Sequence, residues 1–235
     1  MRVKPVKLGG FNCGRAPNTL LQVTTLCLVC SHLSLNSFFP TPNYLNPLLS
    51  QLCMTTTSPI PTQIPLDGFR LRKFEKNDAD SIVKYINDYE IHRNTATIPF
   101  PYTPKDARQF LKDSELHWKA GTAYRFSIVM NNEVIGCCSL DNVSKKDSTA
   151  ELGYWLGKPF WGKKIMTRAA QAVIQFGFTQ IQLHRISVSH IEGNIASQKI
   201  IEKLGFKYEG TQREDSYREG KWFDSKCYGL LEEEF

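Results

Sequence analysis

The stretch that decides the fold runs from Ala150 to Phe206. It reads AELGYWLGKPFWGKKIMTRAAQAV over residues 150–173 and HRISVSHIEGNIASQKIIEKLGF over residues 184–206. The pattern predicts a strand over 149–156, a basic turn, a helix starting near Gly162, a second strand over 185–190 and a helix that ends at Gly205. Backbone N–H groups at a helix N-terminus lack partners within the helix and bind phosphate well. The turn therefore predicts a ligand that carries phosphate.

Glu151 places a carboxylate in a strand that is otherwise apolar. Alternation along the strand puts Glu151, Gly153 and Trp155 on one face and Leu152, Tyr154 and Leu156 on the other. A buried carboxylate without a partner is costly. Glu151 is therefore a base, a paired structural acid or an exposed residue.

The turn and the second helix carry further polar groups. Lys158, Lys163 and Lys164 make the turn basic, which suits phosphate or simply a solvated turn. Asn194 and Ser197 lie in the first turn of the second helix. They act as helix caps or as hydrogen-bonding neighbours of a bound ligand.

Composition places the chain among ordinary globular proteins, with 41% hydrophobic and 22% charged residues over 235 residues. All 23 acidic residues and 25 of the 29 basic residues lie from Asp67 onward. The main domain is therefore nearly balanced in charge, which argues against direct nucleic-acid binding.

Residues 1–60 are predicted to be a disordered or non-native extension without catalytic groups. Eight of the 12 prolines lie within residues 1–66. The apolar run 20–30 is too short to span a membrane but resembles the core of a targeting segment. A start at Met54, an organelle-targeting peptide over residues 1–53 and secretion are the open alternatives.

The seven cysteines indicate neither a disulfide framework nor a metal site, because their number is odd and Cys27 and Cys30 lack a second pair. Cys137 and Cys138 are adjacent in a predicted strand, so they point to opposite faces as small apolar filler. No metal is expected.

The remaining elements alternate between strands and helices. Thr103, Pro104 and Asp106 predict a capped helix start, and Asn131-Asn132 predicts a tight hairpin. A first strand is expected over 69–74, and a helix whose apolar face runs from Ile82 to Tyr89. The chain is therefore predicted to form a mixed α/β sheet with helices on both faces.

Three motifs occur in order: IPFPYTPKDARQF at 98–110, AELGYWLGKPFWGKKIMTRA at 150–169 and NIASQKIIEKLGFKYEGTQRE at 194–214. Together they resemble the GNAT superfamily of N-acetyltransferases, most closely its RimJ/RimL branch, over residues 67–233. The resemblance implies one domain over 67–235. Its sheet would be mixed but mostly antiparallel, with strands 149–156 and 185–190 splayed around acetyl-CoA.

The resemblance also implies the residues that hold acetyl-CoA, largely through backbone amides. They are Leu152, Gly153, Tyr154, Trp161, Gly162, Lys163, Lys164, Ile165, Met166, Thr167 and Asn194. The family usually has Gly where this chain has Lys164. A positive φ at that lysine would cost about 1–2 kcal/mol and weaken binding, although its ammonium group could pair with phosphate.

Two catalytic residues follow from the same resemblance. Glu151 is predicted to act as the base or to position a water molecule. Ser197 is predicted to donate a hydrogen bond or proton to the leaving thiolate, because Ile201 occupies the place of the family's usual Tyr. Phe100 and Tyr102 are predicted to line the acceptor side.

The implied reaction moves an acetyl group from acetyl-CoA to a primary amine, and the preferred acceptor is a protein N-terminal α-amino group. One alternative is a small amine such as a polyamine or antibiotic, for which Glu209, Glu214 and Asp215 would form an acidic cleft. Another is a catalytically weakened acyl-CoA-binding module, suggested by Lys164. The protein is expected to be a cytoplasmic monomer or homodimer without membrane insertion.

Overall fold

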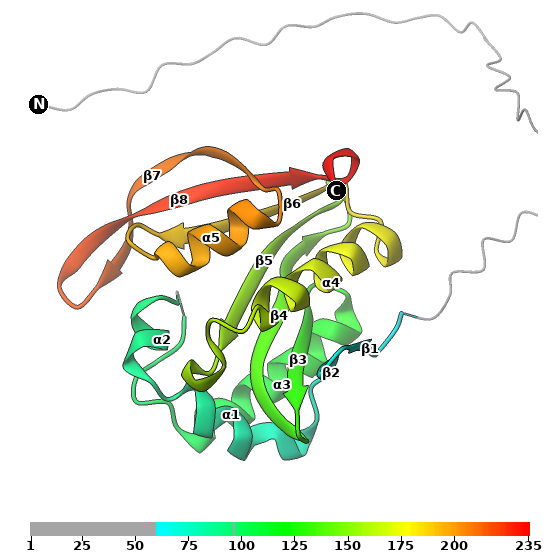
Figure 1. Cartoon of the computed structure of the whole chain (residues 1–235), viewed down its shortest axis with the longest axis vertical. Helices are drawn as coiled ribbons and strands as arrows, with labels where there is room; N and C mark the ends of the chain where they lie inside the picture. The colour runs from blue at the N-terminus through cyan, green and yellow to red at the C-terminus, as the bar shows by residue number, and fades with distance from the viewer. Residues whose placement is uncertain (1–59, 96) are drawn as a thin grey trace, which may run out of the picture. The chain divides into compact units, whose positions relative to one another are not determined.

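A computed structural model describes residues 60–95 and 97–235, and the predictions for residues 1–59 lie outside this part (Figure 1). The strands of the described part form one sheet in the order β1-β2-β3-β4-β5-β6-β8-β7. Neighbouring strands are antiparallel except for β5 and β6, which are parallel. The strands are β1 (Gln63–Leu66), β2 (Phe69–Lys73), β3 (Tyr124–Met130), β4 (Glu133–Ser144), β5 (Thr149–Leu156), β6 (Arg185–Ile191), β7 (Lys207–Arg218) and β8 (Lys221–Leu231).

Helices cover both faces of this sheet, as the sequence predicted. One face packs against α1 and α3, the other packs against α4, and α5 packs beside β6 and α4 (Figure 1). The helices are α1 (Ala79–Ile86), α2 (Tyr89–Arg93), α3 (Pro104–Ala120), α4 (Ile165–Gln180) and α5 (Ile195–Lys203), with 3-10 turns at Lys76–Asp78, Lys158–Phe160 and Glu232–Glu234.

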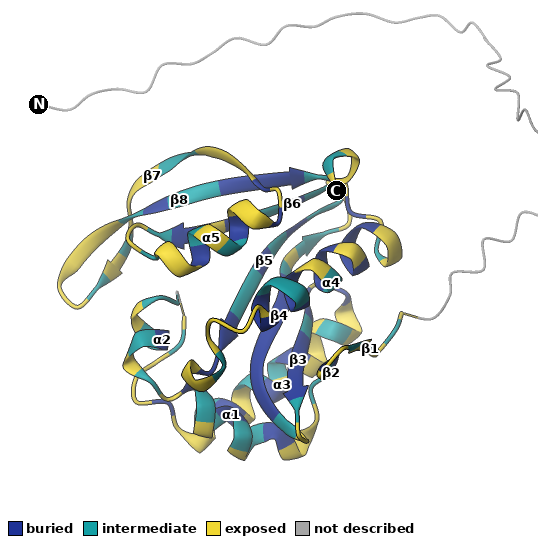
Figure 2. Ribbon diagram, in the orientation of Figure 1, coloured by how far each residue is buried: buried dark blue, intermediate teal, exposed yellow. Residues whose placement is uncertain are grey.

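The sheet separates two apolar cores. Successive side chains of a strand point to opposite faces, so Cys137 and Trp155 join the cluster under α1 and α3, whereas Cys138 and Tyr154 pack in the cluster under α4. Figure 2 shows β3 and β4 as nearly continuous buried strands. The predicted opposite orientation of the adjacent cysteines is confirmed.

The predicted splay between the two central strands is also present. Only Thr149–Glu151 of β5 pairs with β6, through Arg185–Ser187. Beyond Glu151 the two strands diverge, and in Figure 1 their ribbons separate towards the left of the view. A strand edge without a partner leaves backbone N–H and C=O groups that need one. The edge of β5 after Glu151 is therefore available to a ligand.

Local sequence signals locate several element ends correctly. Thr103 and Asp106 form a reciprocal capping box at the start of α3. Asn131 and Asn132 adopt φ values of 50° and 63° in the β3–β4 turn, the left-handed conformation that asparagine tolerates best among larger residues.

The sheet includes a strand, β1, that lies before Asp67 and that the sequence did not predict. Two predicted helix boundaries are wrong. The first helix ends at Ile86, and Tyr89 instead begins the separate short helix α2, capped by Asp88. α4 begins at Ile165 rather than near Gly162, because positive φ values in the preceding turn are incompatible with a right-handed helix.

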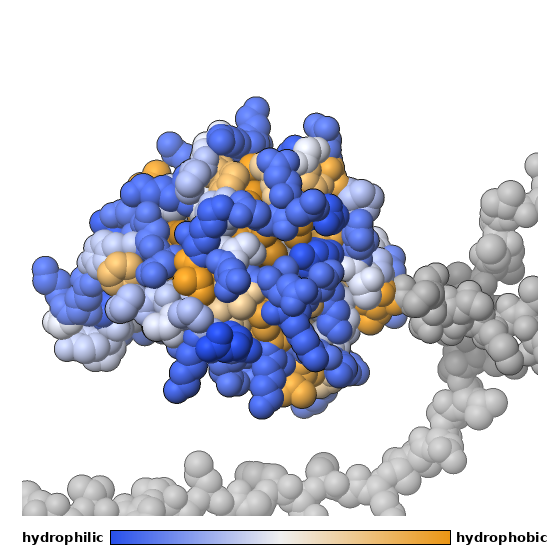
Figure 3. Space-filling model, turned by 90° about the horizontal axis from the view of Figure 1, so that it is seen from below, coloured by the Kyte–Doolittle hydropathy of each residue, from blue (hydrophilic) through white to orange (hydrophobic). Residues whose placement is uncertain are grey.

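The face of the domain shown in Figure 3 is predominantly polar. On the face seen in Figure 3, apolar side chains form small separate patches among hydrophilic ones. Among the described residues, no helix combines the length and apolar character needed to cross a membrane.

Candidate active site

The turn from Gly157 to Lys164 connects the end of β5 to the N-terminus of α4. This turn lies beside the edge of β5 that has no partner strand. Gly162 has a φ of 74°, and Lys164, the N-cap residue of α4, has a φ of 59° and a ψ of 10°. Lys164 therefore occupies the left-handed region, which costs a residue with a Cβ atom about 1–2 kcal/mol. Of the two possibilities that the sequence left open, a strained turn or one that tolerates a side chain, the structure shows the strained turn.

The N-terminus of α4 has no side-chain cap, unlike those of α3 and α5. The first N–H groups of a helix have no acceptor within it, so those of Ile165, Met166 and Thr167 can bind an anion. The side chains of Ile165 and Met166 are buried in the core. These two residues can therefore contribute only their backbone amides, as the resemblance implied.

The side chains of the turn are mostly exposed. The Lys158 ammonium lies 3.7 Å from the Asp88 carboxylate, and the Lys163 ammonium lies 5.6 Å from the centre of the Phe160 ring. The Trp161 indole donates a hydrogen bond of 2.6 Å to the Leu156 carbonyl, which ties the turn to the end of β5. The turn is thus positioned by contacts that leave its backbone accessible.

On the α4 side of the sheet, Tyr154 and Ser197 meet across the opening between β5 and α5. Their hydroxyl oxygens lie 2.6 Å apart. Asn194 caps α5 by accepting a hydrogen bond of 3.1 Å from the Ser197 N–H. Burial raises the pKa of Tyr154 to about 12, so its hydroxyl stays protonated at neutral pH. The resemblance assigned only the Tyr154 backbone, so the contact of its side chain was missed.

Glu151 points to the opposite side of the sheet. Its carboxylate accepts a hydrogen bond of 3.0 Å from the Asn142 side-chain amide. The facing carboxylate of Asp141 is held by Arg125 at 2.7 Å and by Ser139 at 2.6 Å. Asp141 is therefore paired with a cationic side chain, whereas the hydrogen-bond partner of Glu151 is a neutral amide.

The two residues predicted to line the acceptor side differ in exposure. Phe100 is 47% exposed, and its ring lies 5.7 Å from that of Tyr89 and 5.8 Å from that of His92, centre to centre. Tyr102 is buried in the cluster under α1 and α3, and its backbone is hydrogen-bonded to Asn87. Phe100 is therefore the outward-facing ring of this pair, and Tyr102 anchors the loop.

The end of the β7–β8 hairpin contacts α2, an arrangement that the sequence did not predict. The Tyr89 hydroxyl donates to the Glu219 carboxylate at 2.7 Å, and the Arg218 guanidinium donates to the His92 carbonyl at 3.0 Å. Tyr217 and Trp222 lie nearby on the hairpin and are about as exposed as Phe100. These exposed aromatic groups of the loop and the hairpin are called the aromatic rim below.

The acidic cleft considered for a small cationic acceptor is partly neutralised. Glu209 forms a two-point ion pair with Arg185, and this contact holds the pKa of Glu209 below its usual value. The pair lies over Gly229, where a Cβ atom would be 2.3 Å from the guanidinium. Glu209 is therefore paired with a cation and is not a free anion.

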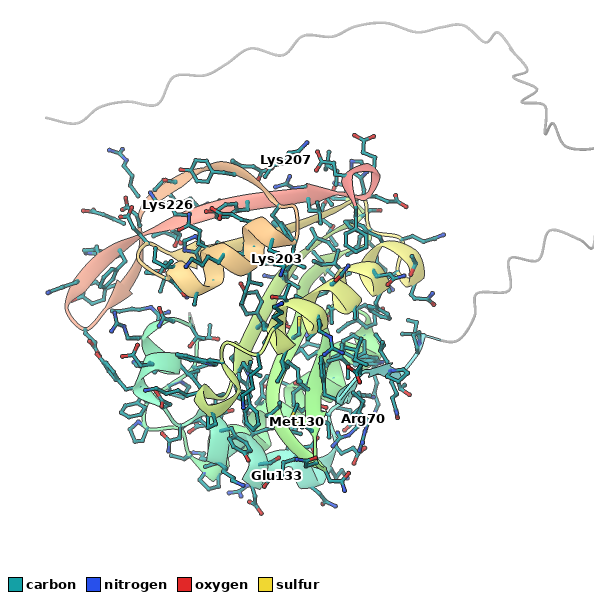
Figure 4. The ribbon with its side chains drawn as sticks, viewed as in Figure 1. Arg70, Met130, Glu133, Lys203, Lys207 and Lys226 are labelled. Carbon is teal, nitrogen blue, oxygen red and sulfur yellow. The ribbon has the colours of Figure 1, made fainter. Side chains whose placement is uncertain are left out.

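Two surface hollows lie away from the splay. One is formed by β1, β2 and β3 and includes Arg70 and Met130. The other, of about 480 Å³, lies between α5 and β8 and includes His190, Lys226 and Tyr228. Figure 4 shows Arg70 and Met130 in the lower half of the molecule and Lys226 in the upper half. In the described part of the chain, no group of three or more His, Cys, Asp or Glu side chains is arranged to hold a metal ion.

Comparisons of the sequence with known proteins identify a family. Residues 69–207 match the family described as acetyltransferase (GNAT) domain. The uncharacterised N-acetyltransferase p20 of Bacillus licheniformis is 34% identical over 70% of this chain and 93% of its own length. The putative ribosomal N-acetyltransferase YdaF of Bacillus subtilis is 28% identical over 70% of this chain and 92% of its own length.

A solved structure shares the fold. RimL, the ribosomal L7/L12 α-N-protein acetyltransferase in complex with coenzyme A, superposes with a TM-score of 0.67 at 21% identity, over 73% of this chain and 97% of that one. The family match and the N-acetyltransferase relatives, together with this fold, define an N-acetyltransferase. The chain belongs to the GNAT acetyltransferase family, and its relatives include acetyltransferases of the RimJ/RimL type.

Proposed function

We propose that this enzyme transfers the acetyl group of acetyl-CoA to the N-terminal α-amino group of a protein. The observation that carries the proposal is the splay between β5 and β6, which widens after Glu151 towards the end of β5 that leads to the uncapped N-terminus of α4. Polar side chains stand on both sides of this opening: Tyr154 and Ser197 on one, and Glu151 on the other.

The features of the opening fit acetyl-CoA. The free amides of Ile165, Met166 and Thr167 and the positive end of the α4 dipole suit the pyrophosphate. The unpaired edge of β5 after Glu151 suits the amide-containing arm of the cofactor, with Asn194 facing it from α5. Acetyl-CoA supplies the activated thioester.

Groups of the protein on the two sides of the opening would perform different parts of the reaction. Backbone N–H groups over Leu152–Tyr154 would stabilise the charge that develops on the carbonyl oxygen of the acetyl group. Glu151 would accept the proton of the acceptor amine, directly or through water. Ser197 would donate a hydrogen bond to the departing sulfur atom.

The preference for an α-amino group rests on amine chemistry and on the relatives. An α-amino group has a pKa near ~8 and a lysine side chain near ~10.4, so far more of the former is neutral and nucleophilic at pH 7. YdaF and RimL are named for ribosomal-protein acetylation. The neutralised Glu209 weakens the case for a small polycation, and the aromatic rim suits a larger acceptor.

Thiol release in the presence of acetyl-CoA tests this proposal. The acceptors to compare are a peptide with a free N-terminus and no lysine, the same peptide with a blocked N-terminus and one lysine, and spermidine. We expect the first to react at least about 100-fold faster than the second, with a mass increase confined to the N-terminus. Reaction with spermidine alone would contradict the acceptor class, and no reaction with any amine would favour the binding-module alternative.

Comparison of Lys164→Gly with Lys164→Ala is expected to separate the effect of backbone strain at this position from the effect of the lysine charge. Glycine relieves the left-handed strain, so the free energy of unfolding should exceed that of Lys164→Ala by about 1 kcal/mol. Both variants lose the ammonium group, so both should bind acetyl-CoA about three- to tenfold more weakly at low salt, and less so at high salt. Denaturant titration and calorimetry measure the two effects. Tighter binding by Lys164→Gly would instead show that the lysine handicaps the turn.

A further inference from the structure

Tyr154 lines the opening, and the function proposed above uses only its backbone. Its side chain has no assigned role. Tyr154 lies three positions beyond Glu151, the last residue of β5 that pairs with β6. Its side chain faces α4 and α5, whereas those of Glu151 and Trp155 face the other way. The phenol thus reaches across the opening to Ser197 on α5.

Either hydroxyl group of this contact can be the donor, and the surroundings of Ser197 bear on what each choice leaves free. Ser197 is 8% exposed, and Asn194 holds its backbone N–H, so its position on α5 is constrained. A serine hydroxyl can accept one hydrogen bond and donate another. If the phenol donates to the Ser197 oxygen, the serine hydrogen is left to point into the opening.

We propose that Tyr154 is a positioning residue that donates to Ser197 and thereby turns the serine hydroxyl towards the leaving sulfur atom. The inference rests on the proposed function, in which acetyl-CoA occupies the opening. As the amine nitrogen bonds to the acetyl carbon and the carbon–sulfur bond breaks, the electron pair stays on sulfur and the amine proton passes to Glu151 or water. The two hydroxyl groups stabilise the sulfur anion through a polarised chain of hydrogen bonds.

The chain of hydroxyl groups donates hydrogen bonds without giving up a proton. An ordinary thiol has a pKa near ~8.5, whereas burial raises that of Tyr154 to about 12. The phenol therefore holds its proton more tightly than the thiol does. The departing thiolate acquires its proton from solvent after release, and the pair keeps its protons throughout turnover.

A double-mutant cycle with Tyr154→Phe and Ser197→Ala tests the inference, with acetyl-CoA and a peptide that has a free N-terminus. We expect Tyr154→Phe to lower kcat about five- to tenfold and Ser197→Ala to lower it further, while KM for acetyl-CoA changes by less than about twofold. The double variant should be no slower than Ser197→Ala, because Tyr154 acts through the serine. The loss in Tyr154→Phe should be constant from pH 6 to 9, since the phenol does not ionise there.

Two controls make the result decisive. Rates are normalised to the folded fraction from circular dichroism, and Ser197→Thr, which keeps a hydroxyl, should retain most of kcat even if Tyr154→Phe folds poorly. Losses that multiply in the double variant, or a loss confined to KM, would overturn the inference while leaving the proposed function intact. An inactive wild-type protein would overturn both.

Discussion

Replacing Glu151 by glutamine is expected to lower kcat with a peptide acceptor about 100-fold. The loss follows from removing the group that accepts the amine proton, an effect usually worth 10²- to 10⁴-fold. Glutamine is nearly isosteric and keeps a carbonyl oxygen for the Asn142 amide, so the fold should be unaffected. Thiol release measured from pH 6 to 9 checks the prediction. The residual activity should rise up to about pH 8, because solvent then deprotonates the α-amino group itself.

The matched control is Glu133→Gln. Glu133 lies at the far lower end of the molecule in Figure 4, where it contacts Lys84 and Tyr85. This variant should keep its kcat within about twofold. If Glu151→Gln were equally active across the pH range, Glu151 would be a structural acid and the base would have to be sought elsewhere.

Replacing Asp78 by alanine is expected to lower the free energy of unfolding by about 3–5 kcal/mol, the usual cost of removing one partner of a buried ion pair. The Asp78 carboxylate accepts two hydrogen bonds of 2.8 Å from the Arg72 guanidinium and one of 2.7 Å from the Glu75 N–H. These contacts join β2 to the turn that starts α1. The Arg72 side chain is only 12% exposed, and its charge would keep only the exposed Glu75 carboxylate, 3.4 Å from its Nε atom, as a counterion. Denaturant titration followed by circular dichroism measures the change.

An exposed ion pair on α3 provides the comparison. Lys119 and Glu115 lie one helical turn apart at 2.8 Å, and both side chains are largely in solvent. Glu115→Gln should leave the denaturation midpoint unchanged within error, because exposed pairs contribute little. If Asp78→Ala had an equally small effect, the anchoring of α1 by Arg72 and Asp78 would be wrong.

The features of the site that could be predicted from the sequence lie within one continuous segment of the chain. The strand–turn–helix pattern predicted the turn before α4, although it placed the start of the helix too early, and alternation along the strand placed Glu151 on the face away from Tyr154. The departure from glycine at Lys164 identified the position where strain was possible, and its φ of 59° shows that strain. Each of these features is set by residues close together in the sequence.

The missed features all join distant segments. The Tyr154–Ser197 contact spans 43 residues, the Tyr89–Glu219 contact 130, and the Arg185–Glu209 pair 24. Side-chain polarity alone does not say which partner a tyrosine or glutamate finds across a sheet. The register of β6, β8 and β7 decides the Arg185–Glu209 pair, and no local pattern fixes that register. The packing of α5 against β5 and of the β7–β8 hairpin against α2 decides the other two contacts.

Hydrogen exchange with and without acetyl-CoA tests the central claim most directly, because it reports where the donor binds. Binding in the splay should slow exchange at the amides of Ile165–Thr167 and along Leu152–Leu156, with smaller effects elsewhere. Protection confined to the groove lined by His190, Lys226 and Tyr228, or no protection at all, would contradict the assignment of the splay between β5 and β6 as the acetyl-CoA site.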